Sequence, residues 1–392
     1  MALPNVNISI ANGQLGRVDG TNDGVAGLLL SGVATAQLPL STPTQLFSFT
    51  QLVDLGITDV NNPLVYKEIK AFYDQAGNGA ELWLMTVADT VLLVDICDKT
   101  KDYATKLING SNGRIRILGI NRIPAEGYVP VIAEGLDQDV IGALTKLQTF
   151  ADESAESYKP FRALLPGLGF VKASVSALKD LTQGTANRCS IVLGCDAEDT
   201  VAIGLTLGRL AAIPVQRNIA RVKDGDVGIL EAYFPDGTPS TELEANWNSI
   251  HDKGYIFFRR IYGKSGYYFT DDPTATGPTD DYCFIGRGRV IDKALTIAYS
   301  NFIEQLNDEI PIDAQTGKVA PALIASWKAD IESALAINMT ARQEIISAKC
   351  YIDPAQNVLT SDTINATISI VPVGYAKKIQ INLGLSNPFK AA

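Results

Sequence analysis

The sequence predicts a mixed α/β and α+β architecture: a discontinuous α+β core, a mainly parallel α/β region inserted into it, and strand-like terminal arms. Between Cys97 and Asp272, short apolar runs alternate with amphipathic stretches, which is typical of a parallel sheet covered on both faces. Two long amphipathic helices follow, and both chain ends alternate apolar and polar residues. The expected divisions are an arm (1–20), a first core part (21–95), the inserted region (96–280), a second core part (281–376) and an arm (377–392).

The first core part is expected to hold two strands and one helix with well-marked ends. Val25–Val33 and Glu81–Val87 are apolar runs of strand length. Between them, Asn61-Asn62-Pro63 supplies an N-cap and a proline at the first helical position, and Gly77 closes the helix.

The inserted region is expected to alternate strands with helices. The expected strands are Ile115–Ile120, Phe161–Leu165, Cys189–Leu193 and Tyr255–Ile261, and the expected helices are Val140–Phe150, Val175–Leu181 and Val201–Leu210. In the last helix, Gly204 and Gly208 share one face, and this spacing predicts tight packing of the helix on the sheet.

The second core part is expected to contain two helices and two strands, and each arm is expected to be a strand. The helices carry apolar residues from Ile291 to Leu306 and from Ile324 to Leu335, and the strands lie near Ala348–Ile352 and Thr363–Val371. The arms place apolar residues on one side, namely Val6, Ile8 and Ile10 at the N-terminus and Ile379, Ile381 and Leu383 at the C-terminus.

Composition excludes several function classes. The 392 residues carry a net charge of −10, so a nucleic acid would be repelled in the absence of a basic patch. The single histidine, His251, leaves almost the whole chain without the commonest general base and metal ligand. The five cysteines lack metal-like spacing and are expected to be reduced, buried thiols of a cytosolic protein. No signal peptide, membrane anchor, metal or cofactor is expected.

Three motifs have a functional and a structural interpretation. Tyr262-Gly263-Lys264-Ser265 ends like a phosphate-binding loop but lacks its earlier glycine, which favours a hairpin turn. Gly167-Leu168-Gly169 lacks the third glycine of a dinucleotide site. The acid pairs at 271–272 and 280–281 are interpreted as solvated turns, although Asp271, Asp272 and His251 remain the candidates for an enzyme acting on a small polar substrate.

Segments from both halves of the chain resemble contractile tail sheath proteins of bacteriophages and related injection systems. The first half contributes DGVAGLLLSGVA, FSFTQLVDLGI and VYKEIKAFYDQAGNGAELWLMTV in that order. The second half contributes SGYYFTDD, DYCFIGRGRVIDKA and ISIVPVGYAKKIQINLGL. The sequence most resembles the sheath-like proteins of phages and prophages of Bacteroidetes.

The resemblance implies a structural subunit without enzymatic activity. Such subunits stack as rings around an inner tube, and both arms add strands to a sheet of neighbouring subunits. The implied partners are further copies, the tube, and baseplate and tail terminator proteins, and the implied location is the host cytoplasm during assembly and then the virion tail or a released injection particle. Arg287, Arg289 and Lys293 are the candidate tube-facing residues, since an acidic subunit needs a local basic patch to dock on an acidic partner. The alternatives are a cytosolic α/β enzyme and a shell or baseplate component.

Overall fold

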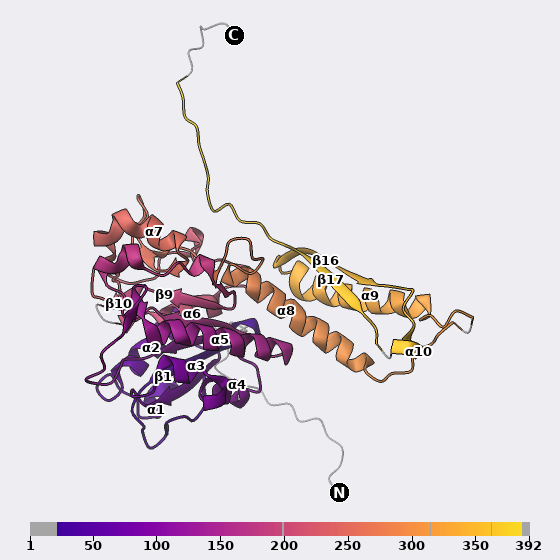
Figure 1. Cartoon of the computed structure of the whole chain (residues 1–392), viewed down its shortest axis with the longest axis horizontal. Helices are drawn as coiled ribbons and strands as arrows, with labels where there is room; N and C mark the ends of the chain where they lie inside the picture. The colour runs from indigo at the N-terminus through magenta and orange to yellow at the C-terminus, as the bar shows by residue number, and fades with distance from the viewer. Residues whose placement is uncertain (1–21, 198–199, 314, 362, 386–392) are drawn as a thin grey trace, which may run out of the picture. The chain divides into compact units, whose positions relative to one another are not determined.

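The computed structural model describes residues 22–197, 200–313, 315–361 and 363–385 (Figure 1). The chain divides into two compact units, of which the first ends at Glu309 and the second begins at Ile310. The predicted N-terminal strand through Val6, Ile8 and Ile10 lies outside the described residues.

The first unit is built on a seven-stranded sheet with the order β12-β9-β7-β4-β1-β3-β2. All neighbouring pairs are parallel except β2 and β3, which are antiparallel. The strands are β1 (Ala26–Ser31), β2 (Thr44–Leu46), β3 (Leu82–Val87), β4 (Ile117–Asn121), β7 (Arg162–Pro166), β9 (Cys189–Val192) and β12 (Tyr255–Ile256).

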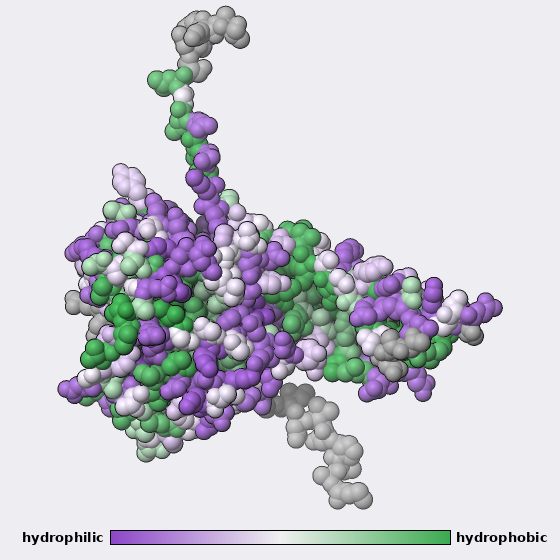
Figure 2. Space-filling model, in the orientation of Figure 1, coloured by the Kyte–Doolittle hydropathy of each residue, from purple (hydrophilic) through white to green (hydrophobic). Residues whose placement is uncertain are grey.

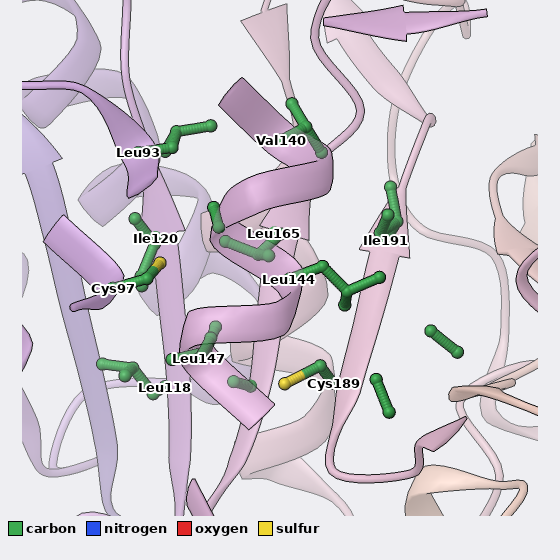
Figure 3. Close-up of a cluster of buried hydrophobic side chains, with 14 of the residues drawn as sticks. Leu93, Cys97, Leu118, Ile120, Val140, Leu144, Leu147, Leu165, Cys189 and Ile191 are labelled. Atoms are coloured by element: carbon green, nitrogen blue, oxygen red, sulfur yellow. The ribbon is translucent and has the colours of Figure 1, made fainter. Parts of the chain in front are cut away.

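Helices cover both faces of this sheet. They are α1 (Phe49–Asp54), α2 (Pro63–Ala76), α3 (Leu93–Cys97), α4 (Ala104–Gly110), α5 (Gln138–Glu156), α6 (Ile203–Ala212), α7 (Trp247–Asp252) and α8 (Ile285–Phe302). In β1, Leu28 and Leu30 join the core of α2 and α6, whereas Leu29 joins the core of α3 and α5. Figure 3 shows the second core, where Leu144 and Leu147 of α5 lie over Leu165 of β7. Every residue of β1 is buried because both of its faces are covered.

Short antiparallel strand pairs lie outside the seven-stranded sheet. They are β5 (Ile132–Ala133) with β6 (Leu136–Asp137), β8 (Thr185–Ala186) with β15 (Ala275–Thr276), β10 (Cys195–Ala197) with β11 (Thr200–Val201), and β13 (Phe258–Arg259) with β14 (Tyr268–Phe269). The last pair confirms the hairpin predicted around Tyr262–Ser265. The five cysteines are all buried, where mostly buried thiols are predicted, and no disulfide is present among the described residues.

Helix α2 begins and ends where the sequence predicts. Asn62 precedes its first residue, Pro63, and Gly77 follows with a φ of 78°, a backbone conformation that favours glycine. The Asn62 side chain does not cap the helix. Its Oδ1 accepts from the Val33 N–H at 2.6 Å and its Nδ2 donates to the Val33 carbonyl at 3.1 Å, so it holds the loop after β1.

The sheet differs from the expected division of the chain near Cys97. Strands β1 and β3 belong to the expected first core part, yet β1 also pairs with β4 of the expected inserted region. The residues described from 22 to 309 therefore form one unit around one sheet. A second difference concerns Val175–Leu181, which lies in 3₁₀ turns rather than in an α-helix.

The glycine face of α6 packs against another helix and not against the sheet as predicted. A Cβ built at Gly204 would lie 2.0 Å from the Glu68 carbonyl oxygen, and one at Gly208 would lie 2.4 Å from that of Phe72. Both carbonyls belong to α2. The two glycines thus let α6 and α2 approach at backbone distance.

Replacing Glu68 with glutamine is expected to remove a pH dependence of stability. Burial, with a smaller contribution from the Asp196 charge, raises the pKa of Glu68 from 4.5 to about 8. The folded chain then keeps a proton that the unfolded chain releases. Glu68 makes its full contribution to stability below the pKa that it has in the unfolded chain. This contribution is lost as the pH rises through the pKa of Glu68 in the folded chain.

Urea unfolding at about pH 5 and about pH 9 measures this effect. The wild type is expected to lose more stability than Glu68→Gln between the two pH values, and Glu126→Gln, at an exposed position, serves as the control. An equal loss in the wild type and in Glu68→Gln would contradict the assignment.

The second unit contains a helix against a two-stranded sheet. Its elements are α9 (Pro321–Leu335), β16 (Ile345–Ile352), α10 (Val358–Ser361) and β17 (Ala366–Pro372). Ile324, Trp327, Ile331 and Leu335 form the buried face of α9, which confirms the predicted spacing. Strands β16 and β17 are antiparallel, with Cys350 opposite Ile368.

Candidate assembly surfaces

The β16–β17 sheet is a short sheet whose second strand is largely uncovered. Within the described residues β17 pairs with β16 alone. Its Thr367, Ser369 and Val371 are exposed, while Ile368 and Ile370, on the other face, are half-buried. A strand with one open edge offers a row of backbone N–H and C=O groups to another chain.

The described part of the C-terminal arm leaves this sheet without forming a strand. Residues 373–385 carry no helix or strand. Ile379, Ile381 and Leu383 are 76%, 74% and 93% exposed. Figure 2 shows hydrophobic and hydrophilic residues interspersed along this extended segment. Single exposed apolar residues are ordinary on protein surfaces, but three at alternate positions would share one side of this segment if it were extended as a strand.

Two of the three predicted tube-facing residues are buried inside the first unit, which corrects that prediction. Arg289 is 3% and Lys293 8% exposed. Lys293 Nζ lies 2.7 Å from Asp23 Oδ2, and Arg289 donates to the carbonyl oxygens of Asp23 and Ile213. Their charges therefore fix α8 to the segment that enters β1. Arg287 is exposed, with its guanidinium 5.4 Å from the Phe284 ring centre.

A buried ion pair fixes α8 to strand β7 of the sheet as well. Arg162 of β7 donates from Nε and Nη2 to the two carboxylate oxygens of Asp292, at 2.6 and 3.0 Å. Arg188 donates to the same carboxylate at 3.0 Å. The Arg162 Nη2 also donates to the Gly288 carbonyl, where the absence of a side chain leaves room for the guanidinium. Helix α8 is therefore held along its first half by charged contacts with the rest of the first unit.

The residues considered for catalysis have structural roles. Asp271 and Asp272 are buried, which corrects their interpretation as a solvated turn. Asp272 accepts from the Gly286 N–H at 3.0 Å at the start of α8, and Asn218 donates to both carboxylates. His251 lies in the last turn of α7, as predicted, 3.6 Å from Asp271. The nearby Asp271 carboxylate, more than that of Asp252, raises the pKa of His251.

A surface hollow lies away from the residues considered for catalysis. A surface hollow of about 830 Å³ between α2, α6 and β10 is lined by neither His251 nor the acid pair. Across the described ranges no group of three or more His, Cys, Asp or Glu residues is placed to hold a metal ion. In that same part of the chain, none of the helices has the length and apolarity needed to cross a bilayer.

The fold is that of contractile sheath proteins. The contracted helical sheath of the anti-feeding prophage matches with a TM-score of 0.64 at 13% identity, over 98% of this chain and 99% of that chain. The contracted sheath of the extracellular contractile injection system PVC matches at 0.59 and 12%, over 98% of both chains. A sheath tail protein of Desulfitobacterium hafniense matches at 0.51 and 9%, over 94% and 100%.

The sequence itself shows the family to which the chain belongs. Residues 3–273 match the family DUF2586, N-terminal domain, and residues 281–390 match DUF2586, C-terminal domain, so the chain belongs to the DUF2586 family. No curated protein matched the chain. The sheath resemblance drawn from the sequence is thus confirmed at the level of the fold, while its placement in Bacteroidetes stays a prediction.

Proposed function

We propose that this chain is the repeating subunit of a contractile tail sheath, and that it acts mechanically and not as an enzyme. The observation that carries the proposal is the extent of the fold match. It covers 98% of this chain and 99% of a sheath subunit, so nearly the whole of each chain takes part in the match. The buried roles of Asp271 and Asp272 also speak against catalysis by this acid pair.

In this proposal the subunits stack as rings around an inner tube, bounded by baseplate and tail terminator proteins, first in the host cytoplasm and then in a virion tail or a released particle. Both terminal arms donate strands to neighbouring copies. Strand donation by the C-terminal arm is supported by the open edge of β17 and by three exposed residues of the arm, Ile379, Ile381 and Leu383. Val6, Ile8 and Ile10 are proposed to act in the same way at the N-terminus. Arg287 remains the candidate contact with the tube.

Strand donation suits a contracting assembly energetically. Each main-chain hydrogen bond contributes about 0.5–1.5 kcal/mol, and each buried isoleucine about 1.5–3 kcal/mol. One arm alone therefore binds weakly. Repetition around every ring makes the connected sheath strong, and the linkers let the subunit bodies rotate without breaking the connections.

Deleting residues 1–16 is expected to leave a folded subunit that cannot form tubes. The deletion removes the proposed donated strand and leaves every described residue in place. Negative-stain microscopy with the inner tube protein measures assembly, and circular dichroism measures folding. Striated tubes are expected from the wild type and discrete particles from the truncated chain.

A matched pair of variants tests whether tube formation needs the apolar side of the N-terminal strand or only the length of the chain. Val6→Ser, Ile8→Ser and Ile10→Ser together remove the apolar side and should abolish tubes, whereas Asn7→Ala with Ser9→Ala changes the opposite side and should not. Normal tubes from the truncated chain would rule out the N-terminal strand. Closed rings from the wild type would favour a shell or baseplate component, and globular particles with substrate turnover would favour an enzyme.

A further inference from the structure

The hollow between α2, α6 and β10 has one wall, from Val227 to Tyr233, that is held at both ends. The Val227 N–H donates to the Tyr267 carbonyl oxygen at 2.9 Å, and the Val227 carbonyl oxygen accepts from Gln75 Nε2 of α2 at 2.9 Å. At the other end, Tyr233 exchanges two backbone hydrogen bonds of 2.9 Å with Cys195 of β10. Because both ends of the wall are fixed, the hollow is formed before any partner binds.

The rim of the hollow combines an apolar side chain with acidic ones. Leu230, midway along the wall, is 99% exposed. Asp74 and Glu231 line the same hollow and are also exposed. Asp74 lies 2.6 Å from Lys70, but both side chains are more than half exposed, so this pair contributes little and a cation of another chain can replace it. A third acid, Asp196, is engaged by a lysine of α2 at 2.8 Å. Among the described residues that line the hollow none is basic, so it suits an apolar group that carries positive charge.

The hairpin tip, from Arg260 to Lys264 between β13 and β14, is such a group. Its Tyr262 side chain is fully exposed, and the two basic residues, also exposed, lie two positions to either side. The Lys264 N–H donates to the Ile261 carbonyl oxygen at 3.0 Å, and Gly263 has a φ of 77°, which favours glycine. The turn is therefore ordered by its own backbone, and binding costs it little conformational entropy.

The hairpin tip and the hollow complement each other in charge and polarity. Arg260 and Lys264 match the two exposed acids of the rim, and the ring of Tyr262 matches the exposed Leu230. Tyrosine and arginine are among the residue types that most often anchor protein interfaces, where they fill well-packed pockets. The described residues that line the hollow include none from the tip, so within one copy the two surfaces do not meet.

We infer that the hairpin tip of one copy binds in the hollow of a second copy, a contact that rests on the sheath function proposed above. Tyr262 packs against Leu230 of the neighbouring copy, and the two basic residues of the tip pair with the two exposed acids of the rim. Because the tip and the hollow are different surfaces, each copy offers one of each. The contact therefore repeats from copy to copy, as a ring or a helical assembly requires.

Disulfide trapping tests the contact directly. Tyr262→Cys and Leu230→Cys are combined in one chain, whose native cysteines are buried, and the protein is oxidised under tube-forming conditions. We expect a ladder of disulfide-linked oligomers, at least tenfold more abundant than with Tyr262→Cys and Val129→Cys. Val129 is the matched control because it is an exposed apolar residue that does not line the hollow. Equal trapping in the two proteins overturns the inference.

The size of the linked species also decides the geometry. Linked dimers without larger species would show a two-fold contact that does not repeat. An internally linked monomer would show that the tip reaches the hollow of its own chain. Either result overturns the inference.

Charge reversal tests the ionic part of the contact. The tip variant, Arg260→Glu with Lys264→Glu, and the rim variant, Asp74→Lys with Glu231→Lys, each place like charges on both sides of the contact. Both variants are expected to lose tubes in negative-stain images while circular dichroism shows them folded. A chain with all four substitutions restores opposite charges and should form tubes again.

The control for charge reversal changes two exposed lysines that do not line the hollow, Lys101→Glu with Lys106→Glu, and should leave tubes intact. Normal tubes from the tip or the rim variant overturn the inference while the sheath function stands, and so does a folded fourfold variant without tubes. A wild-type chain that forms no tubes contradicts the proposed function itself. Trapping in concentrated protein then still decides whether the tip binds the hollow, as it does if a charge variant fails to fold.

Discussion

Substituting alanine for both Gly204 and Gly208 is expected to destabilise the first unit by roughly 3 kcal/mol or more, since each overpacked position costs about 1–3 kcal/mol. The added Cβ atoms would meet the carbonyl oxygens of Glu68 and Phe72 at 2.0 and 2.4 Å. A backbone carbonyl cannot rotate away as a flexible side chain can, so the two helices must move apart. Both helices contribute to one apolar core, and the separation would loosen it.

Urea unfolding of the double variant and of each single variant measures this loss. Gly142→Ala is the matched control, because that glycine also lies inside a helix and its Cβ would meet only Val94 Cγ2 at 3.3 Å. Alanine should be tolerated there, since it favours the helix by about 1 kcal/mol relative to glycine. A double variant as stable as the wild type would show that α2 and α6 are not in backbone contact.

The second large effect is expected for Asp292→Ala, with a loss of about 3–5 kcal/mol, because removing one partner leaves a buried charge uncompensated. Arg162 is 2% exposed and donates two hydrogen bonds to this carboxylate. Arg188 loses the same acceptor. The first half of α8 should then separate from the sheet before the rest of the unit unfolds.

Hydrogen exchange of α8 together with thermal unfolding measures the effect. Asp74→Ala removes an exposed partner of Lys70 in α2 and should cost about 0.5 kcal/mol or less. Similar losses in the two variants would argue against a structural role for the Arg162–Asp292 pair. Asp292→Asn should fall between them, because an amide keeps one acceptor oxygen but not the charge.

Elements with local signals could be predicted from the sequence. The ends of α2 are marked by neighbouring residues, with Asn62 and Pro63 at its start and Gly77 at its end. Apolar runs mark β1 and β3. The order of strands could not be predicted in the same way, because pairing joins distant segments. Nothing near Ala26 indicates that β1 lies between β3 and β4, and the change of pattern at Cys97 therefore looked like a boundary.

The assembly surfaces were predictable to different degrees. Alternation marked Ile379, Ile381 and Leu383, which the structure leaves exposed. The basic residues Arg289 and Lys293 looked like a surface patch, but their partner Asp23 lies some 266 residues earlier in the chain. Glu332 of α9 accepts the Cys350 N–H of β16. It carried no sequence signal at all, since an isolated acid in an amphipathic helix is expected on its solvated face. Its role depends on the strand beside it.

The way in which the chain enters β1 has a mechanical consequence. Asp23 is tied to Arg289 and Lys293, and three residues later β1 runs between β3 and β4, parallel to both. Consider tension applied at the N-terminal end of β1, along the axis of that strand. It must shear two rows of hydrogen bonds at once, not open one row bond by bond. The segment from Asp23 to the start of β1 is therefore well placed to bear load.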